Sequence, residues 1–168
     1  MATRKLWIYS PDVTSRLEYT AGVIFCTVLG INYEITTDRR KIGASPAIIY
    51  TNEKVKDQFV IRPSGLLGEA GLGQASPEVT FLDEMPLLFP SEGGSIPFDP
   101  FSAVFYMVSR YEEYLPFSPD AHGRFQGTSS LAFRGGFLQM PVVEIWSRYL
   151  AAELVRRYPV LTIRHNEY

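Results

Sequence analysis

Residues Phe98–Phe117, FDPFSAVFYMVSRYEEYLPF, carry the strongest folding signal in the sequence. Asp99 can accept hydrogen bonds from the free amides of a first helical turn, and Pro100 suits that turn because its missing N–H would have no partner there. Pro116 ends the helix, because its ring clashes with the preceding turn. Between these signals, apolar side chains recur with a period near 3.6 residues: Phe101, Val104, Phe105, Val108, Tyr111 and Leu115. The stretch therefore predicts a core helix over residues 99–115.

The last turn of this helix combines charged and aromatic side chains. Glu112 and Glu113 would oppose the helix dipole there, and Arg110 is placed to pair with Glu113 three residues along the helix. Tyr111 and Tyr114 lie among these charges. Two interpretations are open at this point: a solvated face with one ion pair, or a polar, aromatic patch that meets a ligand or a second domain.

The composition is that of a globular domain with a substantial core. Of 168 residues, 46% are hydrophobic, 14% aromatic and 20% charged, and the net charge of -2 offers no basic surface for nucleic acid or an anionic membrane. The first apolar run, Leu6–Tyr9, is too short for a signal peptide, and the longest, Ala21–Ile31, falls far short of the roughly 20 residues that span a bilayer. We therefore expect a soluble, cytoplasmic chain with neither nucleic acid nor a membrane as partner.

Short apolar runs and one amphipathic segment predict a parallel sheet. A strand over Lys5–Tyr9 precedes a helix that begins at a Ser15-x-x-Glu18 capping box and ends near Gly30, and a second strand follows over Ile31–Thr37. Strand, helix and strand joined by short links form a βαβ unit. Further strands are expected over Ala47–Thr51 and Gln58–Arg62, and a last helix over residues 141–158.

The fold class follows from the apolar character of these strands. Leu6–Tyr9 and Ala47–Tyr50 are runs of the kind that are buried on both faces of a sheet. We therefore expect a single α/β domain over residues 1–168, a three-layer sandwich whose mostly parallel central sheet starts with the βαβ unit. Cys26, the only cysteine, is expected as a small buried side chain of the first helix.

Three weaker patterns complete the prediction. Val79–Leu82 and Met85–Pro90 are short strand candidates, the second at a sheet edge because it contains two prolines, and Val160–Ile163 is a further candidate. The glycine-rich segment 65–73 has neither the Gly-Lys-Ser/Thr of a phosphate-binding loop nor the G-x-G-x-x-G of a dinucleotide site. We expect a connector there with a partly buried leucine face.

The sequence offers little catalytic chemistry. Its two histidines, His122 and His165, belong to no cluster of metal-ligating spacing, so neither a metal centre nor a cofactor is expected. Asp120 and His122 could act as an acid/base pair with Glu112, or Asp120 could simply bind the amides of a solvated turn. No residue is assigned as catalytic.

Several segments together resemble a known domain. They are Ser109–Pro116 (SRYEEYLP), Asp120-x-His122-Gly123-Arg124-Phe125, Gly136–Leu138, Pro141–Val143, Ile31–Asp38 and Ile61–Leu67. The chain resembles, over nearly its whole length, a domain of unknown function on the N-terminal side of polysaccharide-deacetylase-like proteins of Bacteroidetes-type bacteria. In such proteins a deacetylase barrel with a metal-binding Asp-Asp-His-His set follows this domain. Residues 164–168 fall about where its first T-x-D-x-D-like strand would start, so the chain is expected to be the N-terminal part of a longer protein, and no deacetylase residue carries over.

Three functional hypotheses follow. The first, implied by the resemblance, is a non-catalytic accessory domain that docks on a C-terminal deacetylase-like domain in cis or in trans. Its contact patch would consist of Arg110, Tyr111, Glu112, Glu113, Tyr114, Asp120, His122, Arg124 and Phe125. The second is a carbohydrate-binding module in which exposed tyrosine or tryptophan rings stack on a glycan. The third is a stand-alone enzyme that uses Asp120, His122 and Glu112.

Overall fold

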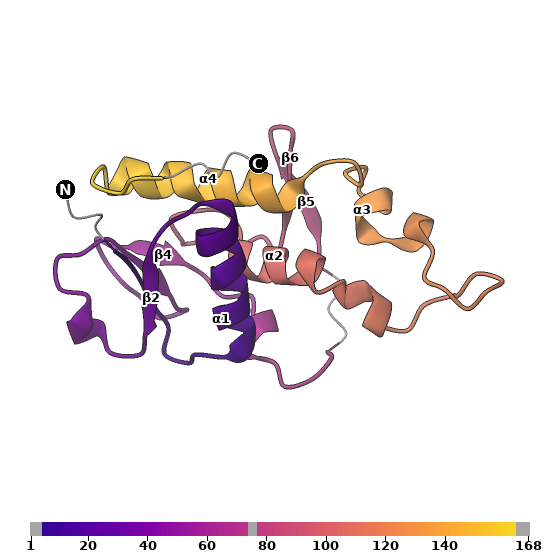
Figure 1. The fold of residues 1–168 in the computed structure, drawn as a ribbon, viewed down its shortest axis with the longest axis horizontal. Helices are drawn as coiled ribbons and strands as arrows, with labels where there is room; N and C mark the ends of the chain where they lie inside the picture. The colour runs from indigo at the N-terminus through magenta and orange to yellow at the C-terminus, as the bar shows by residue number, and fades with distance from the viewer. Residues whose placement is uncertain (1–4, 74–76, 164–168) are drawn as a thin grey trace.

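The computed structural model describes residues 5–73 and 77–163 and places a four-stranded parallel sheet at one end of the molecule (Figure 1). The strands are β1 (Leu6–Tyr9), β2 (Tyr33–Thr36), β3 (Ala47–Tyr50) and β4 (Phe59–Ile61), in the order β2-β1-β3-β4. Every pairing is parallel, and Ile8 of β1 lies opposite both Ile35 and Ile48. The predicted α/β class, the parallel sheet and the opening βαβ unit are confirmed.

A continuous helix connects β1 to β2, and its second half differs from the prediction. It begins as α1 (Ser15–Ala21) and continues as the π-helix η1 (Gly22–Val28). The N-cap is Thr14, whose Oγ1 accepts a hydrogen bond from the Leu17 amide at 3.2 Å, one residue before the predicted cap. The wider π-helical turn changes which side chains face the core. Cys26 is exposed as a result, so the prediction that it is buried is wrong.

The predicted helix over residues 99–115 is two helices. Asp99 caps α2 (Pro100–Val108), accepting hydrogen bonds from the amides of Phe101 and Ser102 at 3.1 and 3.2 Å, as predicted. The helix ends at Ser109 because Arg110 adopts a left-handed conformation with φ of 52°. A 3-10 helix, η4 (Tyr111–Tyr114), follows Arg110. The second half of the predicted helix is therefore wrong.

The remaining elements pack around α2. The long helix α4 (Val142–Arg157) lies across α2 and η1, and the Trp146 indole donates a hydrogen bond to the carbonyl of Pro86 at 2.7 Å (Figure 1). Pro86 belongs to an antiparallel hairpin of β5 (Val79–Leu82) and β6 (Met85–Leu88). A short helix, α3 (Leu131–Arg134), precedes α4 and has no counterpart in the prediction. Residues 160–163 form a turn and irregular chain instead of the predicted strand, because the Leu161 amide donates to the carbonyl of Tyr158.

The two faces of the sheet are covered differently. On one face, α1, η1 and α2 bury a large core that includes Leu6, Ile8 and Ile48. On the other face, a smaller cluster contains Tyr9 and Ile49, and it is closed by Ile42, which follows the 3-10 helix η2 (Arg39–Lys41), and by loop residue Val55. The sandwich thus has a thin outer layer built of one 3-10 turn and loops.

A buried tyrosine gives the fold a predictable response to alkaline pH. The Tyr50 hydroxyl donates a hydrogen bond to Asp99 at 2.7 Å, and burial raises the pKa of Tyr50 well above its usual value of about 10. Above about pH 10 the unfolded chain loses the proton of the Tyr50 hydroxyl, whereas the folded chain keeps it. We therefore expect the free energy of unfolding to fall by about 1.4 kcal/mol per pH unit above pH 10 on account of this residue. Urea denaturation at increasing pH measures the slope, which Tyr50→Phe should reduce and Tyr114→Phe should leave unchanged.

Candidate functional site

The predicted patch divides into surface and core residues. Arg110 and Glu113 form the predicted ion pair at 2.6 Å. Tyr114 is 67% exposed, but Tyr111 is only 2% exposed. The Tyr111 hydroxyl accepts a hydrogen bond from the amide of Gly73 at 2.9 Å and donates one to its carbonyl at 3.2 Å. Tyr111 therefore fastens the glycine-rich connector to η4 and presents no surface to a partner.

The Glu112 side chain also binds another segment of the chain. Its carboxylate accepts a hydrogen bond from the amide of Leu131, the first residue of α3, at 2.6 Å. Burial raises the pKa of Glu112, while the hydrogen bond from the Leu131 amide, the Arg134 charge and the Tyr106 hydroxyl act in the opposite direction. The residue ties η4 to α3, and the chain between these two helices loops outward. We call this loop, residues 115–130, the arm; it includes the 3-10 helix η5 (Gly127–Ser129).

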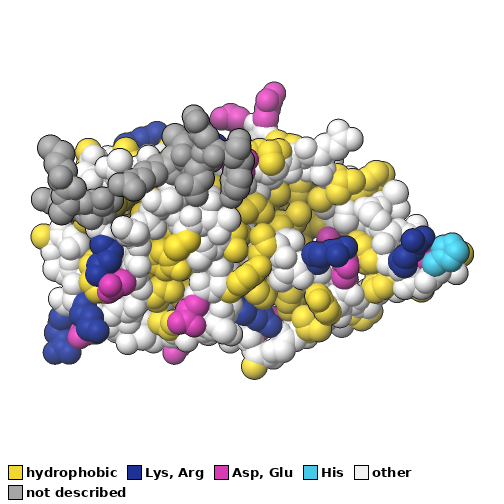
Figure 2. Space-filling model, in the orientation of Figure 1, with side chains coloured by type: hydrophobic (Ala, Val, Ile, Leu, Met, Phe, Trp, Pro, Cys, Tyr) yellow, Lys and Arg dark blue, Asp and Glu magenta, His cyan; other side chains and the backbone are white. Residues whose placement is uncertain are grey.

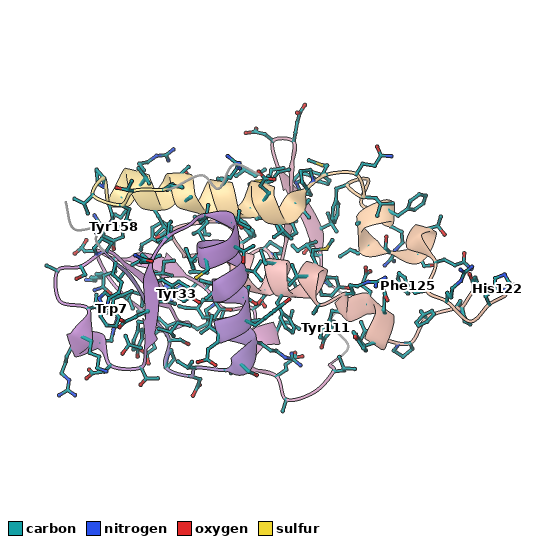
Figure 3. All side chains as sticks on the ribbon, in the orientation of Figure 1. Trp7, Tyr33, Tyr111, His122, Phe125 and Tyr158 are labelled. Carbon is teal, nitrogen blue, oxygen red and sulfur yellow. The ribbon has the colours of Figure 1, made fainter. Side chains whose placement is uncertain are left out.

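The tip of the arm is a closed turn. Asp120 Oδ1 accepts hydrogen bonds from the amides of His122 and Arg124 at 2.8 and 2.9 Å, and Oδ2 pairs with the Arg124 guanidinium. The bond from the Arg124 amide is the main reason that the pKa of Asp120 is lowered. His122 lies exposed at the end of the arm and points away from the body (Figure 3). Asp120 thus occupies the solvated turn considered above, and Glu112, which binds Leu131, has no shared contact with Asp120 or His122.

Aromatic and apolar side chains cover the base of the arm. The Phe117 and Phe125 rings meet edge to face at 5.2 Å, and they line a groove of about 490 Å³ with Glu112 and Arg134. Near this groove Tyr114, Phe133 and Leu138 are each at least half exposed. Figure 2 shows apolar side chains gathered over the surface on this side of the molecule. The arm and the helices on both sides of it thus present several exposed apolar side chains.

A second candidate site lies at the opposite end of α2, where the parallel strands end. A cavity of about 300 Å³ is lined by residues that follow β1, β3 and β4 directly: Ser10, Pro11, Asp12, Thr51, Asn52, Glu53, Pro63 and Gly65. Thr14, Leu17, Tyr50, Leu67 and Gly68 complete the lining. In the strand order β2-β1-β3-β4, the chain reverses its direction of winding between β1 and β3. Ligands of open parallel sheets bind at such switch points.

The walls of this cavity, which we call the switch-point pocket, are held by hydrogen bonds to the main chain. Arg62 donates to the carbonyls of Thr51 and Glu53 at 2.9 and 2.5 Å, which fixes the loop after β3. Thr14 Oγ1 donates to the carbonyl of Leu67 at 2.7 Å and joins the start of α1 to the far wall. The pocket is therefore preformed. The sequence pattern did not predict this pocket, although polar residues follow each apolar strand directly.

The described residues contain neither a metal-ligating cluster nor a membrane-spanning helix. Across 5–73 and 77–163, no group of three or more His, Cys, Asp or Glu side chains is arranged to hold a metal ion. Over the same ranges, no helix has the length and apolar character required to cross a membrane. His165, the second histidine of the sequence, lies outside the described residues.

A protein-family model matches most of the chain. Residues 6–159 match the model of DUF7033, which is described as a family of unknown function. The chain belongs to this family. The DUF7033 match includes every residue of the arm and every residue that lines the switch-point pocket, so both sites belong to the family domain. No curated protein and no solved structure gives a significant match to the chain.

Proposed function

We propose that this DUF7033 chain is a non-catalytic accessory domain that docks on a carbohydrate deacetylase-like catalytic domain, in cis or in trans, through the arm. The observation that carries the proposal is the set of exposed aromatic side chains on and beside an arm whose own shape is fixed. Tyr114 is 67% exposed in η4, and Phe133 is 50% exposed in α3, so the helices on both sides of the arm each present an aromatic side chain. Exposed aromatic side chains of this kind dominate the binding energy of many protein interfaces.

The fixed shape of the arm also lowers the entropy cost of binding. Its tip is closed by the Asp120 hydrogen bonds, and its two sides are joined by the Phe117–Phe125 contact. A preformed loop loses little conformational entropy when a partner binds it. The charges nearby are already paired, Arg110 with Glu113 and Arg124 with Asp120, and exposed pairs of this kind orient a partner more than they add affinity.

The choice of partner rests on the resemblance described above. Domains similar to this chain precede the catalytic barrel in polysaccharide-deacetylase-like proteins, so the catalytic domain is the partner available at high effective concentration. Direct stacking of tryptophan on a glycan has less support from the geometry. Trp146 is fully buried, and the Lys5 ammonium lies over the Trp7 ring at 4.5 Å from its centre.

The docking proposal predicts a specific loss of affinity. Tyr114→Ala should weaken binding of this chain to a separately produced deacetylase-like domain at least about tenfold, because it removes the most exposed aromatic side chain beside the arm. Titration calorimetry measures the dissociation constant. The matched control is Tyr19→Ala, which removes a 53% exposed tyrosine from α1. Equal affinities of the wild type and the Tyr114→Ala variant would contradict the proposal.

The mass of the intact protein distinguishes docking in cis from docking in trans. The mass of the intact protein purified from its native cell can be compared with the 19.0 kDa of this chain. A mass larger by the size of a catalytic domain places the docking in cis. A mass of 19.0 kDa requires docking in trans, which the calorimetric titration tests directly.

A further inference from the structure

We propose that residues 68–73, which we call the strap, form a releasable lid at one wall of the switch-point pocket. The strap is the second part of the glycine-rich connector, and its first residue, Gly68, lines the pocket together with Gly65 and Leu67. The proposal rests on how these residues are attached to the domain, and it does not depend on docking through the arm. Release of the strap opens this wall of the pocket while the sheet and the helices stay folded.

The strap has little structure of its own. Within the described part of the chain, no main-chain group of residues 70–73 forms a hydrogen bond with another main-chain group. Residues 68–72 are exposed, and the Leu72 side chain is 56% exposed. Leu66 and Leu67, directly before the strap, are only 2% and 3% exposed. Because a segment with few buried contacts opens at a low free energy, the movable part of the connector begins after Leu67.

Two side chains from different helices attach the strap to the domain. Arg16 of α1 donates hydrogen bonds to the carbonyl of Leu66, at 2.7 Å, and to the carbonyl of Gly71. Tyr111 of η4 binds both main-chain groups of Gly73 through its hydroxyl. The Arg16 guanidinium also lies over the Tyr111 ring, 5.8 Å from its centre, so each side chain helps to position the other. Loss of either one should therefore loosen the whole strap.

The strap is compact enough to move as a unit. Its two ends approach each other closely, since a Cβ atom added at Gly73 would lie 2.6 Å from the Glu69 carboxylate. Gly71 lies between these ends with a φ of 86°, which glycine adopts without strain. Gly68 joins this loop to the pocket wall, where its amide donates a hydrogen bond to the carbonyl of Gly65 at 3.0 Å. That hydrogen bond reports whether the wall is closed.

Limited proteolysis of the full chain, with an enzyme that cleaves after glutamate, measures release of the strap. Glu69 lies within the strap, and the rate of cleavage follows the population of the open state. Arg16→Met keeps a long side chain that donates no hydrogen bond, and we expect it to speed cleavage after Glu69 about tenfold. Tyr111→Phe loses one hydroxyl group and should speed it about fivefold. Cleavage after Glu92, in the exposed loop that follows β6, should not change.

Amide exchange tests whether release of the strap reaches the pocket. Exchange of the Gly68 amide, resolved by nuclear magnetic resonance, should be faster by similar factors in both variants, although this amide binds Gly65 and neither substituted side chain. The matched control is Tyr158→Phe, which removes a tyrosine hydroxyl that donates to the carbonyl of Ala47 at the start of β3, at 3.1 Å. This control should leave both measurements unchanged.

Three results would overturn the proposal. One is an unchanged rate of cleavage after Glu69 in both variants. Another is an equal increase after Glu92, which would show that the whole domain loosens and not the strap alone. The third is an unchanged exchange rate at Gly68 together with faster cleavage after Glu69, which would show that the strap moves without opening the pocket.

Discussion

Replacement of Asp99 by alanine is expected to lower the melting temperature by about 10–15 °C. Asp99 is fully buried, and its carboxylate accepts five hydrogen bonds, two from the cap amides and three from Tyr50, Ser64 and Ser102. Alanine removes the helix cap, which is worth about 1 kcal/mol, and leaves buried donors without an acceptor at about 1–3 kcal/mol each. Alanine also removes the cost of burying the carboxylate, which offsets part of this sum. We therefore expect a net loss of about 3–5 kcal/mol, which for a chain of this size gives the stated change in melting temperature.

Two further variants test the cause of this loss. Asp99→Asn keeps one acceptor oxygen for the cap but turns an N–H₂ group towards the Ser64 amide, so we expect about half of the alanine effect. Asp38→Ala removes the cap of η2 at the protein surface and should have a much smaller effect, because water replaces the lost acceptor. Thermal denaturation followed by circular dichroism measures all three. Equal losses for Asp99→Ala and Asp38→Ala would show that burial of the carboxylate is unimportant.

The sequence predicted those parts of the fold that depend on local signals. Asp99 caps its helix, Arg110 pairs with Glu113, and the four strands lie where short apolar runs end in turn residues. Each of these features depends on residues within a few positions of one another. Local spacing also indicated the solvated turn at Asp120, because its amide partners are two and four residues away.

The error in the predicted helix has its cause in contacts between distant segments. The helix predicted over 99–115 stops at Ser109 although its apolar period continues, because Tyr111 and Glu112 bind Gly73 and Leu131, 38 and 19 residues away. The π-helical turn that exposes Cys26 could not be predicted either, because the apolar spacing of this segment also fits an α-helix. Such tertiary bonds outweigh local helix propensity, which amounts to a few tenths of a kcal/mol per residue.

The arm and the switch-point pocket differ in how far apart in the sequence their residues lie. The sequence predicts a patch that overlaps the arm, because the motif residues Arg110–Tyr114 and Asp120–Phe125 are close in sequence. The switch-point pocket was missed because its lining comes from three segments that only the strand order brings together, after β1, β3 and β4. A parallel sheet without a known strand order does not reveal its switch point. The sequence shows polar residues after the buried strands, but it does not show that these residues come together in space.

Replacement of Tyr111 by glutamate is expected to unfold the chain, whereas the same change at Tyr114 should have almost no effect on stability. Tyr111 is 2% exposed and packs against Phe105 and Tyr106, at ring distances of 6.2 and 5.6 Å. Loss of a buried aromatic ring costs about 3–5 kcal/mol, and an unpaired buried carboxylate adds to that cost. The sum is comparable to the total stability of a typical domain, about 5–15 kcal/mol. Tyr114 is 67% exposed, so its substitution should change the stability by less than about 0.5 kcal/mol.

This pair of variants decides how a docking experiment must be designed. Tyr111→Glu would abolish binding to any partner simply because the fold is lost, so only Tyr114 variants report on contact through the arm. Urea denaturation of both variants, with Tyr111→Phe as a control that keeps the ring and loses only the two hydrogen bonds to Gly73, separates packing from bonding. We expect about 1 kcal/mol for the phenylalanine variant. A stable, folded Tyr111→Glu variant would show that η4 can detach from the core, and the arm would then be a movable element instead of a preformed one.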